Sequence, residues 1–314
     1  MPGMKEIKNR INSVSDTRKI TNAMYLIAST KLRKARQEWD KTKPYFESLE
    51  WEMQRIFQLQ EDTESDYFFP ASIKSDDADI DGTYGYLVIT ADKGLAGAYS
   101  QNVIKTTLQM MQKHDDNKLF VVGEVGRHYF NLHKIPIEQS FLYSAQSPNM
   151  LRAAEISEIL LDMYNAGELS KIYVIYTNMK NSISQEVCSE RLLPLHRADF
   201  LEDYSGEYKG NIYEFMPNFS DVLDAITPNY LTGYIYSALV DSFCCEQNAR
   251  MMAMDSANTN ADELLGRLRV EYNHLRQNAI TQEITEVAAG AKAKRKKAEK
   301  EKQRKKKSIK EQAI

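Results

Sequence analysis

Residues 7–35 read IKNRINSVSDTRKITNAMYLIASTKLRKA, and this stretch decides the fold. Mostly apolar or small side chains recur in it at alternating spacings of four and three, which is typical of the seam of a left-handed coiled coil. The register continues to residue 56, through Ile7, Ile11, Val14, Arg18, Thr21, Tyr25, Ala28, Leu32, Ala35, Trp39, Thr42, Phe46, Leu49, Met53 and Ile56. About fifty helical residues that rise ~1.5 Å each span roughly 75 Å, so this helix needs a partner helix.

The C-terminal part of the chain supplies a candidate partner. Thr227 followed by Pro228 predicts a helix start, because threonine can cap backbone N–H groups and proline is tolerated at the first helical position. Downstream, small and apolar residues recur on one face, at Ala249, Ala253, Ala257, Ala261, Leu264, Leu268, Leu275 and Ala279. A stripe of alanines allows a second helix to approach closely. We therefore expect the two terminal helices to form an antiparallel left-handed coiled coil.

The periodicity changes between about Thr83 and Pro194. Short apolar runs at residues 86–90, 119–122 and 172–176 predict buried strands of a parallel sheet, with helices near 101–112 and 149–165. Segments near 136–141 and 186–193 are expected to complete the sheet, in an order that the sequence leaves open. The prediction is an α/β domain with a Rossmann-like open sheet, inserted between the two long helices.

The predicted organisation has six parts. They are an N-terminal helix at residues 1–58, an acidic linker at 59–82, the α/β domain at 83–198, a connector at 199–226, a C-terminal helix at 227–290 and a basic tail at 291–314. The linker is expected because its many aspartates and glutamates show no periodicity. From residue 292 onward the tail has twelve Lys or Arg against three Glu, a net +9 in a chain whose total is −3. The tail is therefore a strongly basic segment whose charge is opposite to that of the rest of the chain.

The only loop that resembles a ligand site is the 92–97 turn, Asp92-Lys93-Gly94-Leu95-Ala96-Gly97, between an expected strand and helix. Such a turn can bind phosphate through backbone N–H groups. It lacks both the G-x-G-x-x-G pattern and the G-K-[ST] ending of a P-loop, which favours glycines that only form a tight turn. The five histidines are scattered and the three cysteines form no C-x-x-C pair. No catalytic, cofactor-binding or metal-binding residue is predicted.

The chain contains no apolar run of the ~20 residues that cross a bilayer and no recognisable N-terminal signal segment. Its mean hydropathy is −0.53. These features predict a soluble protein, and three cysteines without a C-x-x-C pair favour a reducing compartment.

Four blocks of sequence resemble the gamma subunit of F-type ATP synthases, of the bacterial type. They are ITNAM at 20–24 with Ala28 and Lys31, GYLVITADKGLAG at 85–97, EQNARMMAM at 246–254 followed by Asn260-Ala261, and YNHLRQNAITQEI at 272–284. The last block is the strongest match, since it is close to the carboxyl-terminal signature of the family. The blocks occur in the family's order and extend to about Gly290.

The resemblance implies a central-stalk rotor subunit, present in one copy per complex, with no catalytic site and no cofactor of its own. The implied partners are the alpha and beta subunits of the catalytic hexamer, the epsilon subunit and the membrane c-ring, and no nucleic acid. The implied location is peripheral, at the cytoplasmic face of the bacterial cell membrane. Whether the coupling ion is a proton or sodium stays open.

The resemblance also implies contact residues. Contacts with the beta subunits are expected from Met24, Lys31, Arg276, Gln277, Thr281, Gln282 and Glu283. An apolar tip is expected from Ile280, Ile284, Val287 and Ala288. The structural alternatives are a solvated helix face for the polar residues and the end of the coiled-coil seam for the apolar ones.

Two other classes of function stay open. The 92–97 turn on its own allows a nucleotide-binding α/β protein with helical arms, and the tail allows a coiled-coil scaffold that binds nucleic acid or anionic lipid. Members of the resembled family usually end near the equivalent of Ala291, so the tail is an extension. It is either a solvated segment without a role or an electrostatic brake or tether near the crown of the hexamer.

Overall fold

The computed structural model describes residues 3–59, 65–69, 81–141, 145, 148–180, 184–197, 200 and 216–311. Most of the predicted acidic linker and connector lies outside these residues. The chain divides into two units, one of Met1–Ala23 with Asp255–Ile314 and the other of Met24–Met254. Two long helices take part in both units, α1 (Met4–Leu59) and α6 (Phe219–Glu311).

The second unit contains a five-stranded sheet with the strand order β3-β2-β1-β4-β5. The strands are β1 (Tyr84–Ile89), β2 (Asn117–Val122), β3 (Gln139–Phe141), β4 (Lys171–Met179) and β5 (Gln185–Leu193). The first four run parallel and β5 pairs antiparallel with β4. The predicted open α/β sheet between two long helices is thus confirmed, and its edge strand β5 makes it a mixed sheet.

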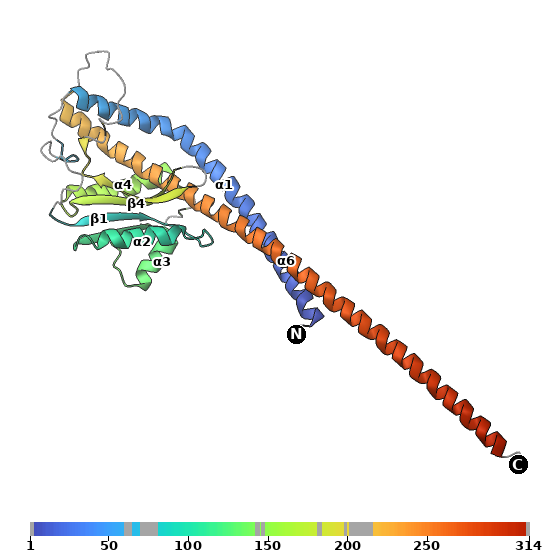
Figure 1. Cartoon of the computed structure of the whole chain (residues 1–314). Coiled ribbons are helices and arrows are strands. Elements are labelled where there is room, and N and C mark those ends of the chain that lie inside the picture. The colour runs from blue at the N-terminus through green and yellow to red at the C-terminus, as the bar shows by residue number, and fades with distance from the viewer. Residues whose placement is uncertain are drawn as a thin grey trace. The chain divides into compact units, whose positions relative to one another are not determined.

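Helices cover both faces of the sheet, with α2 and α3 on one face and α4 on the other (Figure 1). Their bounds are α2 (Tyr99–Met111), α3 (Glu124–Leu132) and α4 (Met150–Asn165). β1 is buried along its whole length, which explains its unbroken apolar run. Tyr86 and Val88 belong to the core on the α2 and α3 side, and Leu87 and Ile89 to the core that includes α4.

Helix α6 begins earlier than the sequence predicts. The expected start at Thr227 is wrong, because the helix begins at Phe219 and the Asn218 side chain accepts a hydrogen bond from the backbone N–H three residues later, at 2.8 Å. Pro228 therefore lies inside the helix. Leu223, in the turns before the proline, is completely buried, and this packing offsets the backbone hydrogen bond that the proline removes.

In the second unit α1 packs antiparallel on α6. The rings of Trp39 and Phe46 stack with centroids 6.2 Å apart, and both contact Tyr236 of α6, at 5.9 and 6.2 Å. Gly233 faces Phe46 so closely that a Cβ at this position would overlap the ring. The buried seam residues of α1 here are Ala28, Leu32, Met53 and Ile56. The predicted register of α1 is therefore confirmed in this unit.

The middle of α6 is buried on nearly every side. Leu231, Ile235 and Leu239 share one apolar core with residues of the sheet and with Leu32 and Met53 of α1. A helix that is apolar all round is expected only where neighbours cover it completely. This part of α6 is thus held between α1 and the sheet.

Candidate partner-binding surface

In the first unit the N-terminal turns of α1 pair with α6. The buried apolar residues of this pair are Ile7, Leu265 and Leu268. Arg18 Nε lies 2.8 Å from the Asp262 carboxylate, and the Thr21 hydroxyl donates to the Asn258 amide oxygen. Arg18 and Thr21 are polar positions of the predicted seam, so each finds a complementary group on the opposite helix. Polar pairs of this kind fix the register of a helix pair more than they add to its stability.

Beyond Leu275, α6 has no helical partner in the part of the chain that the structure describes. Every residue from 276 to 298, here called the exposed segment, is exposed. The expected pairing of the two terminal helices therefore does not reach Ala279, because α1 starts only at Met4 and its turns are already matched by earlier residues of α6. Ile280, Ile284 and Val287 are 45, 64 and 70% exposed. An apolar stripe left open in this way indicates a surface that another molecule covers.

The polar contact residues that the sequence predicts on α6 also lie on the exposed segment. They are Arg276, Gln277, Thr281, Gln282 and Glu283. The Gln282 amide donates to Glu286 at 2.9 Å, one turn further along. Ala288 of the predicted tip is exposed as well. The structure therefore brings the α6 part of the predicted set together on one accessible segment of helix.

The predicted contact residues of α1 are less accessible. Met24 and Lys31 are both half-buried in the second unit. Burial raises the pKa of the Glu246 carboxyl on α6, and the positive charges of Arg250 and Lys31 act in the opposite direction. The neighbouring Arg36 donates to the Met179 sulfur at 2.7 Å. Basic residues of this stretch thus take part in contacts within the chain.

The 92–97 turn is bound by an arginine of α6. Arg250 Nη2 donates to the carbonyl oxygens of Lys93 and Gly94, at 3.0 and 3.1 Å, and Nη1 lies 2.7 Å from the Glu246 carboxylate. The side chains of Arg250 and Glu246 are 10 and 1% exposed. Burial raises the pKa of Glu246, and the guanidinium opposes this effect. One cation therefore satisfies a buried carboxylate and two turn carbonyls, an arrangement that fixes the turn on α6.

The two glycines of the 92–97 turn differ in backbone conformation. Gly97 has φ of +58°, whereas the φ of Gly94 is not in this left-handed range and a Cβ there would meet open space. We expect Gly97→Val to lower the free energy of unfolding by about 1–3 kcal/mol and Gly94→Val by less than about 0.5 kcal/mol. Urea unfolding of the full chain, followed by tryptophan fluorescence, measures both. Equal losses for the two variants would contradict the conformational explanation.

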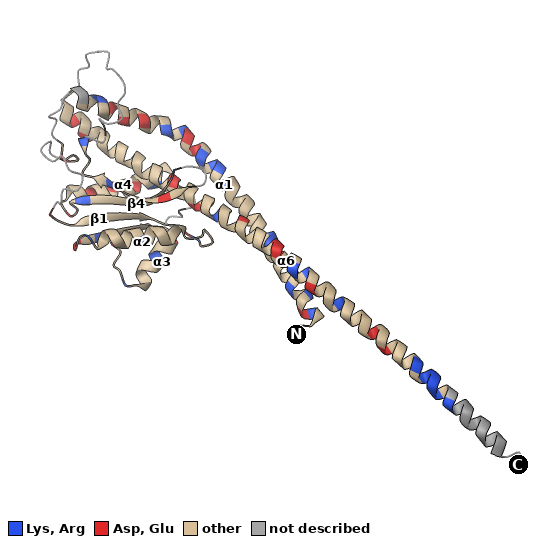
Figure 2. Ribbon diagram, viewed as in Figure 1, with Lys and Arg blue, Asp and Glu red and all other residues tan. Residues whose placement is uncertain are grey.

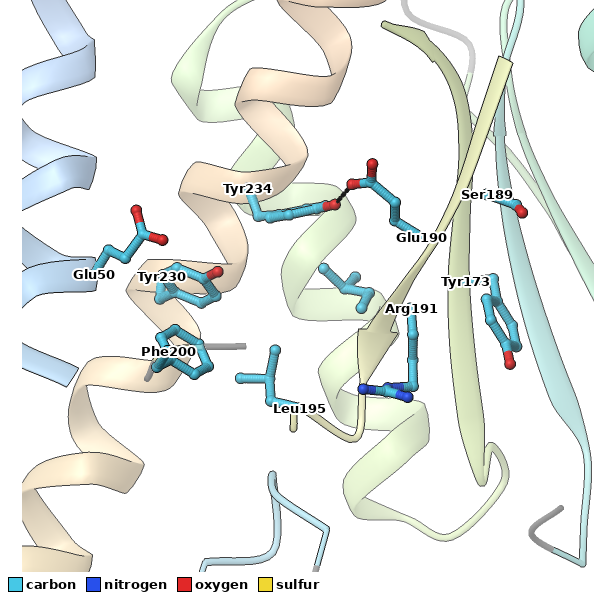
Figure 3. A pocket seen from close by; sticks show the side chains of 10 residues that line it. Glu50, Tyr173, Ser189, Glu190, Arg191, Leu195, Phe200, Tyr230 and Tyr234 are labelled. Carbon is cyan, nitrogen blue, oxygen red and sulfur yellow. Dashed lines mark hydrogen bonds between the residues drawn. The ribbon is translucent and has the colours of Figure 1, made fainter. Parts of the chain in front are cut away.

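A cavity of about 480 Å³ lies in the second unit between α1, α6 and β5. Its charged lining consists of Glu50, Glu190 and Arg191, and Figure 3 shows Tyr234 of α6 hydrogen-bonded to Glu190. Arg191 Nε donates to a backbone carbonyl at 2.7 Å. Burial raises the pKa of Tyr234, which keeps its hydroxyl protonated as the donor. Two carboxylates beside one arginine do not form a site for the phosphates of a nucleotide.

The described residues contain no group of three His, Cys, Asp or Glu placed to hold a metal ion. Cys188, Cys244 and Cys245 are all free thiols. Burial is the largest cause that raises the pKa of Cys244 to about 11 and that of Cys245 to about 12. Both thiols thus stay protonated at neutral pH, which makes them poor nucleophiles. None of the helices formed by the described residues combines the length and apolar character of a membrane span.

The comparison with protein families identifies the chain. A family model described as ATP synthase matches residues 3–293. The ATP synthase gamma chain of Caldanaerobacter subterraneus subsp. tengcongensis is 42% identical over 301 residues, which cover 92% of this chain and 99% of the relative. The chain belongs to the ATP synthase gamma chain family. A second member, the sodium ion specific gamma chain of Acetobacterium woodii, is 33% identical over 306 residues, with 92 and 98% coverage.

Solved structures of ATP synthases have the same fold as this gamma chain family member. A chain in the mitochondrial ATP synthase of Euglena gracilis, in a structure of OSCP, F1 and c-ring, aligns with a TM-score of 0.60 and 15% identity, covering 92% of this chain and 94% of that one. A chain in the central stalk and c-ring structure from Tetrahymena thermophila aligns with a TM-score of 0.56 and 24% identity, with 76 and 99% coverage. The α/β domain between two long helices is therefore the fold of these chains too.

Proposed function

We propose that this chain is the central-stalk rotor subunit of an F-type ATP synthase and transmits rotation between an ion-driven membrane ring and a catalytic hexamer of alpha and beta subunits. The observation that carries the proposal is the match of residues 3–293 to the ATP synthase family, with relatives named gamma chain over their whole length. The Tetrahymena thermophila structure, which contains a chain of the same fold, is of a central stalk and c-ring. The partners are thus alpha, beta and epsilon subunits and the c-ring, with one copy of this chain per complex.

The packing of the second unit suits a part that carries torque. An ion that crosses a potential of 100 mV supplies ~2.3 kcal/mol, so the work of several ions must be summed before one ATP is made. Summing requires a stiff connection. Stacking of Trp39 and Phe46 against Tyr236, together with the enclosure of α6 between α1 and the sheet, gives this part of the helix pair that stiffness.

We assign the contact with the beta subunits to the exposed segment of α6. Its polar residues Arg276, Gln277, Thr281, Gln282 and Glu283 offer charge and hydrogen bonds, and the tip formed by Ile280, Ile284, Val287 and Ala288 offers apolar area. Apolar contacts have no preferred direction, so the tip can turn inside an apolar surface of the hexamer without breaking specific bonds. Met24 and Lys31 of α1, which are half-buried, complete the proposed set.

A triple variant tests this assignment. Arg276→Ala/Gln282→Ala/Glu283→Ala removes three exposed side chains, so the free energy of unfolding should change by no more than about 0.5 kcal/mol per site. We expect the affinity of the full chain for the alpha–beta hexamer to fall about tenfold, which corresponds to ~1.4 kcal/mol. Gln101→Ala/Lys105→Ala/Gln109→Ala, three exposed residues of α2, is the matched control. If both triple variants bind the alpha–beta hexamer with equal affinity, the assignment of the contact to the exposed segment is contradicted.

In this proposal the chain has no catalytic site of its own and acts at the cytoplasmic face of a bacterial membrane. The capture of the 92–97 turn by Arg250 supports a structural role for the one loop that resembled a nucleotide site. The bacterial sources of the gamma chain relatives support the location.

Two measurements on the native protein test the proposal. Highly purified chain is expected to neither bind nor hydrolyse ATP, because no nucleotide site is formed by the residues described. Affinity purification of the tagged chain from membranes is expected to recover three alpha-like and three beta-like chains for each copy. Hydrolysis by the isolated chain would instead favour the nucleotide-binding alternative, and recovery without such partners would contradict the rotor role.

A further inference from the structure

A ring of positive charge begins where the family match ends. The family model stops at residue 293 and the relatives are already covered to 98 or 99% of their length, yet α6 continues to Glu311. The basic collar comprises Lys292, Lys294, Arg295, Lys296, Lys297 and Lys300, and all six side chains are exposed. Figure 2 shows it as the blue stretch of α6 that follows a stretch with few charges.

The collar differs sharply from the helix before it. Residues 276–290 contain one basic and two acidic residues, so their charge is nearly balanced. In the collar, a rotation of about 100° per residue spreads the six cations around the whole helix and leaves no arc wider than about 100° without one. The positive field of this part of the helix therefore points in every direction across its axis.

An all-round distribution of charge restricts the kind of partner. A flat anionic surface, such as a membrane, attracts only the cations on one side, and a helix that lies in a membrane also needs an apolar face. The uncharged residues between 291 and 300 are only the alanines Ala291, Ala293 and Ala298. The collar also has no aromatic side chain on which nucleic acid bases could stack. A concave acidic surface that surrounds the helix is the partner that uses all six cations.

We propose that the basic collar binds a concave acidic surface of the catalytic hexamer, which surrounds the helix and holds its end on the axis of rotation. This inference rests on the proposed rotor function. Because the charge is spread around the helix, the attraction changes little as the helix turns. The collar therefore acts as a bearing, and the alternative of a brake that favours particular rotor angles is not supported by its geometry.

Two matched variants test the bearing. Lys292→Gln/Lys296→Gln/Lys300→Gln removes three charges from one arc of about 80°, and Lys294→Gln/Arg295→Gln/Lys297→Gln removes three from the other side of the helix. The affinity of the full chain for the alpha–beta hexamer is measured between about 0.1 and 1 M salt, where the Debye length falls from ~10 to ~3 Å. Both variants are expected to lose affinity by the same factor, about tenfold at low salt, and to differ little from the wild type at high salt.

Three results would overturn the bearing. The first is a loss of hexamer affinity in only one triple variant, which indicates a one-sided contact. The second is an unchanged hexamer affinity in both variants. The third is tight binding of the wild-type chain to anionic vesicles or duplex DNA that both variants lose, while their affinity for the hexamer is unchanged. The inference and the proposed function fail separately. A wild-type chain that does not bind the hexamer at any salt concentration contradicts the function itself, whereas normal coupling and an unchanged salt dependence after replacement of all six cations contradict only the bearing.

Discussion

Replacing Arg250 with methionine is expected to lower the free energy of unfolding of the full chain by about 3–5 kcal/mol. The change leaves the Glu246 carboxylate, which is 1% exposed, without its ion pair at 2.7 Å, and it leaves the carbonyls of Lys93 and Gly94 without their donor. Urea unfolding measures the loss. Arg250→Met/Glu246→Leu is the control, because replacing both partners by apolar groups of similar size removes the unpaired charge and should restore most of the stability.

The loss at Arg250 should also depend on pH. Burial raises the pKa of Glu246 above its ordinary 4.5, whereas Arg250 opposes this shift. An acidic group whose pKa is raised in the folded state makes the protein less stable as the pH rises from the pKa of the unfolded state through the pKa of the folded state. Without Arg250 that window extends to higher pH, so the variant should be closest to the wild type in acid and furthest from it above neutrality. A deficit that shrinks as pH rises would show that the carboxylate is not its cause.

Replacing Gly233 with valine is expected to cost about 3 kcal/mol. A Cβ at this position overlaps the ring of Phe46, which cannot move away because it is packed against Trp39, Tyr45 and Tyr236. The measurement is again urea unfolding of the full chain. Phe46→Ala/Gly233→Val should be more stable than the sum of the two single losses, because the alanine makes room for the new side chain. Additive losses in the double variant would mean that the overlap is not the cause.

The sequence predicts elements that depend on regular patterns. The spacing of Ala28, Leu32, Met53 and Ile56 predicts a buried seam, and the apolar run of β1 predicts a strand that is covered on both faces. All of these residues are buried in the structure. Helix α3 cannot be predicted from the sequence pattern, because it is only nine residues long and follows Gly123, which has a φ of +97° and packs closely against Thr90. The sequence predicts a late start of α6, because the local signal at Thr227 competes with the earlier cap at Asn218 and with the burial of Leu223.

The candidate surface was predictable only in part. The resemblance indicates the residues around Thr281 as contact residues. Their exposure cannot be predicted in this way, because it depends on where α1 begins: the first turns of α1 pair with turns of α6 that precede Thr281. The ion pair of Arg250 with Glu246 has a sequence signal, a spacing of four on a helix, although this signal does not reveal the distant turn that the arginine binds. A contact between residues more than 150 positions apart can be identified only once the fold is known.

Rotation of this chain inside a fixed alpha–beta hexamer tests the central claim most directly. The hexamer is immobilised on a surface, a visible probe is attached to the α/β domain at an engineered cysteine, Lys134→Cys, and ATP is supplied. The account predicts that the probe turns continuously in one direction while ATP is hydrolysed, and that it stops when ATP is removed. Steady hydrolysis with a probe that stays at fixed angles, in complexes that contain the chain, would contradict the rotor function.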